Sequence, residues 1–259
     1  MCLFAANSIT MSEQITYHPD GKVRERCNIV NDQLEGEATS FDEAGNIARK
    51  ATFKAGKLDG EAISYGSNGR VTQKATFIDG ELNGPTSIFG ADGWIVQKMN
   101  YRDGKPNGEA LTYRNGAIQT RSFYVDGVLQ GEFISHDETG NVVGRGQYEK
   151  GKLEGESLWF NKEGQIIKRA QYSNGMLNGD SIDYFPSGAV REKASYKDDK
   201  LDGEYIRYYE TGVVAERAFY NDGKPYGDRL EFDESGDVKD ESGRTSTGIR
   251  GLLSRIKGQ

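Results

Sequence analysis

The sequence predicts an all-β fold: a single-layer antiparallel β-meander of about nine 24-residue hairpin repeats, elongated, curved and twisted, with a short C-terminal helix or tail. Three observations support this prediction. A glycine recurs at a fixed interval along almost the whole chain, apolar and polar residues alternate between these glycines, and turn-forming residues separate the alternating runs. A fixed period of this length is the signature of a repeat architecture, and short alternating runs are typical of half-buried strands.

Anchor glycines set the period. They stand 24 residues apart, except for one interval of 23 residues. The anchor glycines are Gly36, Gly60, Gly84, Gly108, Gly131, Gly155, Gly179, Gly203 and Gly227. An aromatic residue precedes most of them by seven positions, at Phe53, Phe77, Tyr101, Tyr124, Tyr148, Tyr172, Tyr196 and Tyr220. We refer to these aromatic residues as the aromatic ladder.

Each period is interpreted as one β-hairpin. In the copy that begins at Gly60, residues 61–65 alternate, and we expect Ile63 on the face opposite to Ala62 and Ser64. Residues 71–77 alternate again, with Ala75 and Phe77 on one face. Two turns join these runs.

The first turn spans residues 66–69, and its Asn68-Gly69 indicates a tight turn because both residues tolerate positive φ. The second spans residues 79–84. We therefore expect each anchor glycine, Gly155 included, where the chain reverses.

A column of small residues runs beside the aromatic ladder. Its members are Cys27, Ala51, Ala75, Ser122, Gly146, Ala170, Ala194 and Ala218, with Met99 as an interruption. Small residues allow a sheet to curl about its apolar face. We therefore expect a curved sheet whose concave side carries the aromatic ladder, and contiguous apolar surface of that kind marks a binding site.

The repeat resembles a known family. Residues 148–156 read Tyr-Glu-Lys-Gly-Lys-Leu-Glu-Gly-Glu, and residues 101–109 are a close copy. This motif is similar to the MORN repeat (membrane occupation and recognition nexus), and closest to its bacterial variant in antitoxin-like proteins. The resemblance covers residues 17–239. It implies a β-hairpin array and a non-enzymatic role as a toxin-neutralising antitoxin or immunity protein.

Composition points to a protein partner. The net charge of -7 disfavours nucleic acid, which binds clustered Lys and Arg, and favours a basic protein. Two cysteines make no disulfide framework, so we expect a cytoplasmic protein. We divide the chain into an N-terminal tail (1–14), the array (15–239) and a basic amphipathic tail (240–259). The sequence leaves open whether Met1 or Met11 is the start, and it does not indicate an oligomeric state.

The C-terminal segment departs from the repeat. From Ser242 onward it carries four basic residues and no acid, and four aliphatic residues lie at helical spacing. The candidate docking residues are Ile249, Arg250, Leu252, Leu253, Arg255, Ile256 and Lys257. This tail has three interpretations: a cap or disordered end of the array, a segment that docks on a partner, or a contact with an anionic membrane.

The sequence contains no constellation that supports catalysis, a cofactor or a metal ion. His136 holds a column otherwise filled by Phe or Tyr, so we interpret it as an aromatic substitute. The recurrent Glu after each anchor glycine is interpreted as a strand-start residue, solvated or bonded to a neighbouring turn. Equivalent carboxylates lie about 10 Å apart, too far to share one ion.

Departures from the repeat supply the candidate partner-binding residues. Trp94 replaces a polar turn residue, and Trp159 lies on what we take to be the polar strand face. The complete set is Trp94, Trp159, Tyr205, Tyr208, Tyr209 and Tyr226. Aromatic side chains of this kind anchor interfaces. Two functions remain: an array that binds a protein, or a membrane-associated scaffold that uses the basic tail.

Overall fold

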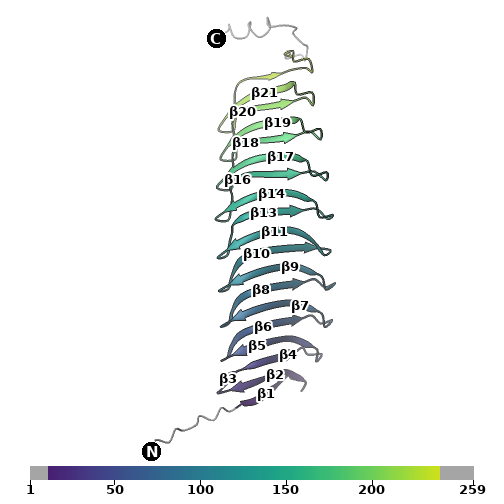
Figure 1. Ribbon diagram of the computed structural model, residues 1–259, viewed down its shortest axis with the longest axis vertical. Coiled ribbons are helices and arrows are strands. Elements are labelled where there is room, and N and C mark those ends of the chain that lie inside the picture. The colour runs from purple at the N-terminus through teal and green to yellow at the C-terminus, as the bar shows by residue number, and fades with distance from the viewer. Residues whose placement is uncertain (1–10, 240–259) are drawn as a thin grey trace, which may run out of the picture. The chain divides into compact units, whose positions relative to one another are not determined.

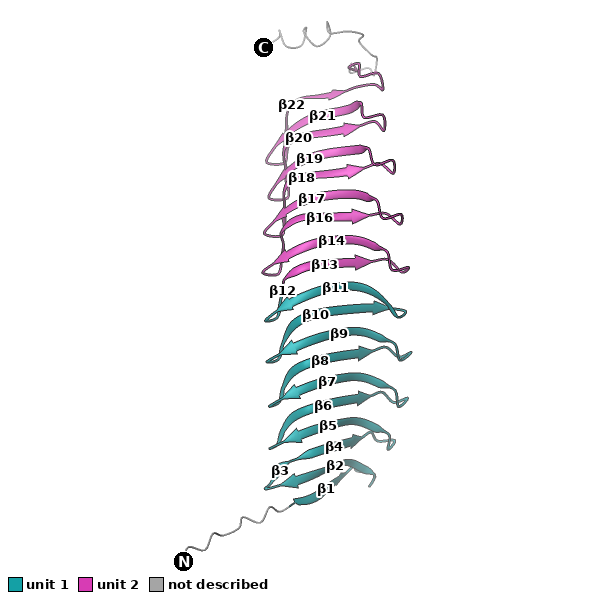
Figure 2. Cartoon of the chain, in the orientation of Figure 1, with its two compact units in different colours: residues 1–128 teal, residues 129–259 magenta. Residues whose placement is uncertain are grey.

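The computed structural model describes residues 11–239, and in this range it contains strands and turns but no helix (Figure 1). The predicted all-β antiparallel fold is confirmed. The chain divides into two compact units, residues 1–128 and 129–259 (Figure 2). The candidate tail residues Ile249–Lys257 lie outside the described residues. Within the described range, no helix has the length and apolar character needed to cross a membrane.

Unit 1 is a meander of antiparallel strands in which each long strand pairs with the next along the chain. The strands are β1 (Met11–Tyr17), β2 (Val23–Val30), β3 (Gln33–Leu34), β4 (Gly36–Phe41), β5 (Ile47–Lys54), β6 (Lys57–Tyr65), β7 (Val71–Ile78), β8 (Glu81–Phe89), β9 (Ile95–Arg102), β10 (Lys105–Arg114) and β11 (Ala117–Val125). The two-residue β12 (Val128–Leu129) falls at the division between the units.

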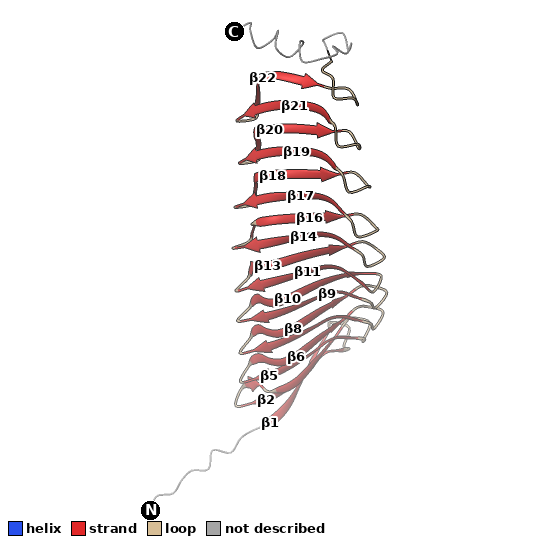
Figure 3. Cartoon of the chain, turned by 45° about the horizontal axis from the view of Figure 1, so that its top comes forward, coloured by secondary structure: helices blue, strands red, loops and turns tan. Residues whose placement is uncertain are grey.

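Unit 2 repeats the same pattern. Its strands are β13 (Gly131–His136), β14 (Val142–Glu149), β15 (Lys152–Leu153), β16 (Gly155–Phe160), β17 (Ile166–Ser173), β18 (Met176–Tyr184), β19 (Val190–Lys197), β20 (Lys200–Tyr208), β21 (Val214–Asn221) and β22 (Lys224–Glu231). Within each unit, tight turns follow one edge and longer loops follow the other (Figure 3).

The two kinds of turn are the reverse of the prediction. At Asn68-Gly69 only Gly69 has positive φ (73°); Gly69 N–H donates to Gly66 O (2.8 Å) and Gly66 N–H to Arg70 O (2.8 Å). This is a type I turn closed by a glycine bulge. The tight two-residue turn lies instead at Asp79-Gly80, where both φ values are positive (51° and 92°), as a type I′ hairpin requires. The predicted turn at residues 66–69 is therefore confirmed, but the tight type that Asn68-Gly69 indicated is wrong.

The anchor glycines do not mark the reversals either. Gly84 lies within β8 at φ 111°, where the ladder passes from Ala75↔Thr86 to Phe77↔Leu82 and leaves extra residues on β8. A Cβ at Gly84 would lie 3.3 Å from the Thr76 side chain. The anchor glycine thus permits a bulge close to the neighbouring strand.

Gly155, like Gly84, does not lie at the reversal of the chain. The chain reverses before it, at Lys150-Gly151, where φ is 50° and 79°. Gly155 then begins β16 with φ 75°. The prediction that Gly155 marks a reversal is wrong, although its need for positive φ is confirmed.

One face of the sheet holds most of the buried residues, and we call it the small-residue face. The predicted column of small residues is buried on this face. A second column, from the first strand of each hairpin, lies beside it, because Ala62 pairs with Ala75 and Ser157 with Ala170. Ala62 and Ser64 therefore share the face of Ala75, and Ile63 lies on the opposite face as the alternation predicts. The buried columns are Cys27, Ala38, Ala51, Ala62, Ala75, Thr86, Ala110, Ser122, Ser157, Ala170, Ser181, Ala194 and Ala218.

Larger side chains close over this column from the tight-turn edge. A Cβ at Gly146 would lie 2.9 Å from Leu153 Cδ1, so the leucine lies directly over the column. The residues of the aromatic ladder are half-buried on the same face. The core is thus a thin strip on a single sheet, since the described residues form no second layer.

The array begins earlier than the sequence suggests. β1 starts at Met11, within the predicted tail of residues 1–14, and its residues pair with β2 from Met11↔Val30 onward. Because β2 extends to Val30, its edge offers backbone partners to residues 11–14.

Candidate partner-binding surface

Two sets of hydrogen bonds tie the tight turns together, one along each unit. In unit 2, each turn donates a backbone N–H to the carbonyl of the preceding turn; Gly175 N donates to Leu153 O at 2.8 Å and Gly223 N to Leu201 O at 2.8 Å. The residue before most anchor glycines adds a side-chain bond to the next turn. Glu154, for example, accepts from Asn174 N at 2.7 Å. This tight-turn edge is therefore occupied by structural contacts.

The face opposite to the small-residue face is called the outer face. Its recurrent acidic residues pair with Lys or Arg side chains of the adjacent strand. Lys193 Nζ lies 2.9 Å from Asp180, and Arg145 Nε lies 3.1 Å from Glu132. The hydrogen bond from Lys193 lowers the pKa of Asp180. The further ion pairs of this type are Arg26–Glu13, Lys50–Glu37, Arg121–Glu109 and Arg217–Glu204. These carboxylates remain solvent-exposed, as one of the two predicted alternatives has it, but the sequence analysis did not predict their ion pairs with the adjacent strand.

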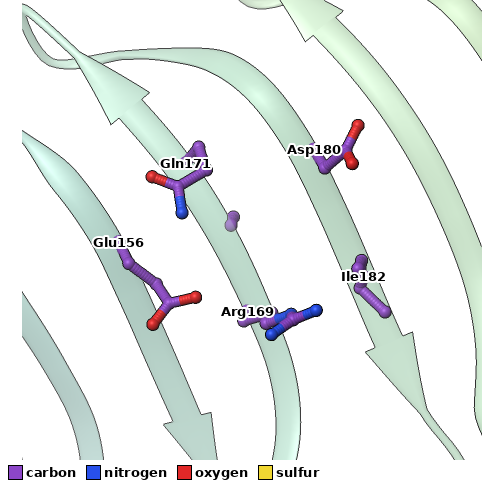
Figure 4. A pocket seen from close by; sticks show the side chains of 6 residues that line it. Glu156, Arg169, Gln171, Asp180 and Ile182 are labelled. Carbon is purple, nitrogen blue, oxygen red and sulfur yellow. The ribbon is translucent and has the colours of Figure 1, made fainter.

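A shallow depression of about 270 Å³ lies on this outer face of unit 2. Figure 4 shows Arg169 of β17 between Glu156 of β16 and Asp180 of β18. Gln171 and Ile182 line it as well. The opposite charges lie side by side, so the depression has no strong preference for an ion of either sign.

The small-residue face of unit 2 carries a charged row that sequence analysis missed. Lys168 Nζ lies 3.8 Å from Asp183, and Glu192 accepts a hydrogen bond from Tyr205. The row continues through Arg207 and Glu216, because the ladder register pairs Glu192 with Arg207 and Arg207 with Glu216. One repeat position holds Arg49, Gln73, Gln97 and Thr120 in successive copies of unit 1. The same position holds Gly144, Lys168, Glu192 and Glu216 in unit 2. The signal was therefore present in the sequence as a change from mostly uncharged to mostly charged residues in one column.

Glu216 is the buried member of this row. Its residue is 5% exposed, and its two carboxylate oxygens contact Arg207 (3.1 Å) and Arg229 (2.8 Å). A buried carboxylate is tolerated when charged partners satisfy both oxygens. This pairing gives the C-terminal end of the face a fixed arrangement of charges.

Trp159 lies on the small-residue face, and not on a polar face as predicted. It is opposite Gly144 in the ladder, and its ring centroid is 6.5 Å from that of Tyr172. The indole is half-buried. An aromatic side chain across from a glycine covers backbone that would otherwise be exposed. The buried part of Trp159 therefore has a structural role, and its exposed part remains accessible to a partner.

Tyr205 shares this face with Trp159. Its hydroxyl donates to Glu192 at 2.9 Å, and its ring lies 6.3 Å from Tyr220 in an edge-on arrangement. Burial, followed by the hydrogen bond to Glu192, raises the pKa of Tyr205 to about 12. The phenol therefore remains protonated and can donate in the physiological range.

The remaining tyrosine candidates lie elsewhere on unit 2. Tyr209 is on the loop edge, where its hydroxyl donates to Phe232 O at 2.8 Å. Tyr226 is 54% exposed and packs against Phe219, with centroids 6.0 Å apart. Tyr208 is half-buried near the end of β20. The five candidates of unit 2 do not form one patch, and Trp159 and Tyr205 are the pair that shares the small-residue face.

Trp94 belongs to unit 1 and is 62% exposed. A Cβ built at Gly116 would lie 3.5 Å from its ring, so the indole rests on the next loop along the array. Arg70 bridges loops in a similar way, since its guanidinium donates to Ala91 O (3.2 Å) and Asp92 O (2.8 Å).

The two histidines lie in different surroundings. His18 Nε2 lies 3.0 Å from Phe41 O, at the repeat position of the Tyr209–Phe232 bond. His136 has a buried Nδ1 without a hydrogen-bond partner. Within residues 11–239, no group of three or more His, Cys, Asp or Glu residues is arranged to hold a metal ion.

These features define an open antiparallel array of β-hairpin repeats. The MORN repeat variant family matches residues 13–31, 34–55, 153–174, 177–198 and 201–222. Five repeats of this chain thus match the family, and the resemblance seen in the sequence is confirmed. No curated protein matches the sequence.

Solved structures are similar only at a low level. The "Crystal Structure of TcdB2-TccC3-Cdc42" is 10% identical with a TM-score of 0.22, over 85% of this chain and 14% of that one. The "Crystal Structure of TcdB2-TccC3-TEV" is 10% identical with a TM-score of 0.18, over 91% of this chain and 16% of that one. This chain thus spans less than a fifth of either, and these scores support no argument about its fold or function.

Proposed function

We propose that this MORN repeat protein is not an enzyme and that it binds a protein partner through the small-residue face of unit 2. One observation carries the proposal: this face combines half-buried aromatic rings, among them Trp159 and Tyr205, with the charged row that ends at Glu216. Aromatic anchors beside fixed charges are the composition of protein interfaces. Repeat arrays commonly present such extended surfaces to partners.

Charge supports a basic partner. The described residues of unit 2 carry 22 acidic and 15 basic side chains, whereas those of unit 1 carry 16 and 14. Complementary charge accelerates encounter and makes the association rate fall as salt rises. The family resemblance adds toxin neutralisation in the cytoplasm as the specific form, in which a basic toxin would be held in a stoichiometric complex.

The test compares two surfaces on one protein. Purified wild-type protein, a Lys168→Glu variant on the small-residue face and a Glu156→Gln variant on the outer face are each used to capture partners from the native cell. The proposal expects one protein to be captured by wild type and Glu156→Gln and lost with Lys168→Glu. Equal capture by all three proteins would show that the interface is not on the small-residue face around Lys168.

The alternative, a membrane-associated scaffold, rests on the basic amphipathic pattern of residues 249–257. Sedimentation with anionic vesicles, with residues 242–259 present and absent, distinguishes the two functions. Tail-dependent sedimentation without any captured protein would reject the protein-binding proposal in favour of the scaffold.

A further inference from the structure

The first strand of unit 1 has an open edge. β1 pairs with β2 on one side, and among the described residues no strand pairs with its other side. Unpaired strand edges are templates for another strand, and proteins usually protect them with Pro, Lys or a bulge. β1 has the sequence Met-Ser-Glu-Gln-Ile-Thr-Tyr, which contains neither Pro nor Lys; its one charged residue is Glu13, and the one irregularity of its ladder with β2 lies at its end, between Thr16 and Tyr17.

The last strand of unit 2 provides the contrast. β22 carries Lys224, Pro225 without an N–H, and Gly227 at φ 71°. In addition, Lys239 N donates to Glu231 O at 2.9 Å, so the return of the chain occupies part of that edge. β22 is therefore more strongly protected than β1, which has no Pro, no Lys and no covering segment among the described residues.

The hydrogen bonds of β2 show which residues of β1 face outward. Asn28 O accepts from Glu35 N (2.9 Å), so Asn28 directs its backbone toward β4 and its neighbours Cys27 and Ile29 direct theirs toward β1. Their partners, Gln14 and Ser12, face β2. The outward residues are therefore Met11, Glu13, Ile15 and Tyr17.

The side chains along this edge are also exposed. Met11 is 67% and Tyr17 is 58% exposed, and both are large apolar residues. Glu13, the one charged residue of β1, is paired with Arg26 (3.3 Å). The edge thus combines free backbone groups with apolar side chains at both ends.

An added antiparallel strand must pair outward residues with outward residues. When β1 is paired with a second copy of itself, the register that uses all seven residues places Met11 opposite Tyr17, Ser12 opposite Thr16, Glu13 opposite Ile15, and Gln14 opposite Gln14. In that register the sulfur–aromatic and hydroxyl pairs match in character. A register centred on Glu13 would place Glu13 opposite Glu13. A register centred on Ile15 would leave Met11 and Ser12 unpaired.

We propose that β1 docks a second copy of this chain, edge to edge and antiparallel, to form a two-fold symmetric dimer centred on Gln14. Isologous pairing of this kind is the commonest form of oligomer in soluble proteins. The proposal does not depend on the partner-binding function, because it uses a different unit and an edge instead of a face.

A charge swap at the symmetry axis tests the proposal. In the dimer the two Gln14 side chains form a narrow, non-hydrogen-bonded pair with Cα atoms about 4.5 Å apart. Gln14 is exposed, so Gln14→Lys and Gln14→Glu leave each monomer folded. Like charges directly opposite are unfavourable, and we expect each variant alone to raise the dimer dissociation constant about fivefold. An equimolar mixture of the two variants should restore dimerisation.

Sedimentation velocity of the full chain over a range of concentrations measures this. Ile15→Pro removes a backbone N–H that points away from β2, so the bonds between β1 and β2 are kept. It removes a backbone hydrogen bond to the second copy and should abolish the dimer. Lys224→Glu on β22 is the matched control and should leave it unchanged. A wild-type chain that stays monomeric to about 100 µM, or Gln14 variants that dimerise like wild type, would overturn the proposal.

Discussion

The indole of Trp159 lies across the antiparallel ladder from Gly144, and the Tyr172 ring lies beside it at 6.5 Å. Two exceptions to the repeat thus compensate each other: β14 lacks a side chain where β16 carries an unusually large one. Phe133 and Gly146 form the same kind of pair one row away, and Phe133 packs edge-on against Tyr148 at 5.9 Å. Replacements that look independent in the sequence are coupled in the sheet.

The first prediction follows from this pairing. Trp159→Ala exposes the backbone at Gly144 and removes the contact with Tyr172, and it should lower the free energy of unfolding by about 2 kcal/mol, less than for a fully buried tryptophan. Trp94→Ala is the control, because Trp94 is 62% exposed and should cost less than about 1 kcal/mol. Urea unfolding measures both. Equal losses would show that the Gly144 pairing has no stabilising role.

The second prediction separates backbone strain from steric contact. Gly155 has φ 75° and open space at its Cβ position, so Gly155→Ala should cost about 1–2 kcal/mol through left-handed strain alone. Gly179 has φ 118°, and its Cβ would lie 3.0 Å from Gln171 Cβ, so Gly179→Ala should cost more.

Hydrogen exchange locates the damage. Because repeat arrays are stabilised by local and nearest-neighbour terms, protection should fall in the substituted hairpin and its neighbours. Protection around Gly36 should be unchanged. An equal loss of protection there would contradict this local picture.

The sequence predicted the fold well because its period and alternation report directly on hairpins. It failed at the turns for a specific reason. Asn68-Gly69 and Asp79-Gly80 are both good type I′ sequences, and only the register of the ladder shows which pair occupies the two-residue turn.

The candidate surface was predicted less completely, because which residues share a face depends on bulges. The shift between Ala75↔Thr86 and Phe77↔Leu82 changes which residues oppose one another, and no local pattern shows it. The same uncertainty placed Trp159 on the polar face. Single aromatic exceptions were visible in the sequence, and so was the change to charged residues in the repeat column of Glu216, but the ion pairs of the charged row depend on the strand register.

The third prediction concerns the loop at Asp137. A hydrogen bond from the Thr139 hydroxyl (2.7 Å), with further bonds from Thr139 N and Asn141, lowers the pKa of Asp137 to about 2. Since the pKa is depressed in the folded state, the loop's stabilisation by this carboxylate is present above the ordinary value of 3.8 and is lost as pH falls through about 2.

Carbon-detected NMR titration measures this pKa. Thr139→Val keeps the shape of the side chain but removes its hydroxyl, and it should move the pKa of Asp137 upward, toward 3.8. Thr211→Val, the same change in a different loop of unit 2, should not affect Asp137. An unchanged Asp137 pKa in Thr139→Val would mean that the hydroxyl is not its main cause.

The last prediction concerns Tyr205, whose phenol is held protonated by burial and by its hydrogen bond to Glu192. Its pKa in the folded state is about 12, above the ordinary value of 10. The corresponding stabilisation is therefore fully present below pH 10 and is lost as pH rises through about 12. Glu192→Gln removes the negative charge but leaves the ring buried, so the pKa of Tyr205 should fall and still remain above 10. NMR titration of ring-labelled tyrosines, with the Tyr205 signal assigned by Tyr205→Phe, measures both values. A pKa in Glu192→Gln equal to that of the wild type would show that Glu192 does not contribute to the raised pKa of Tyr205.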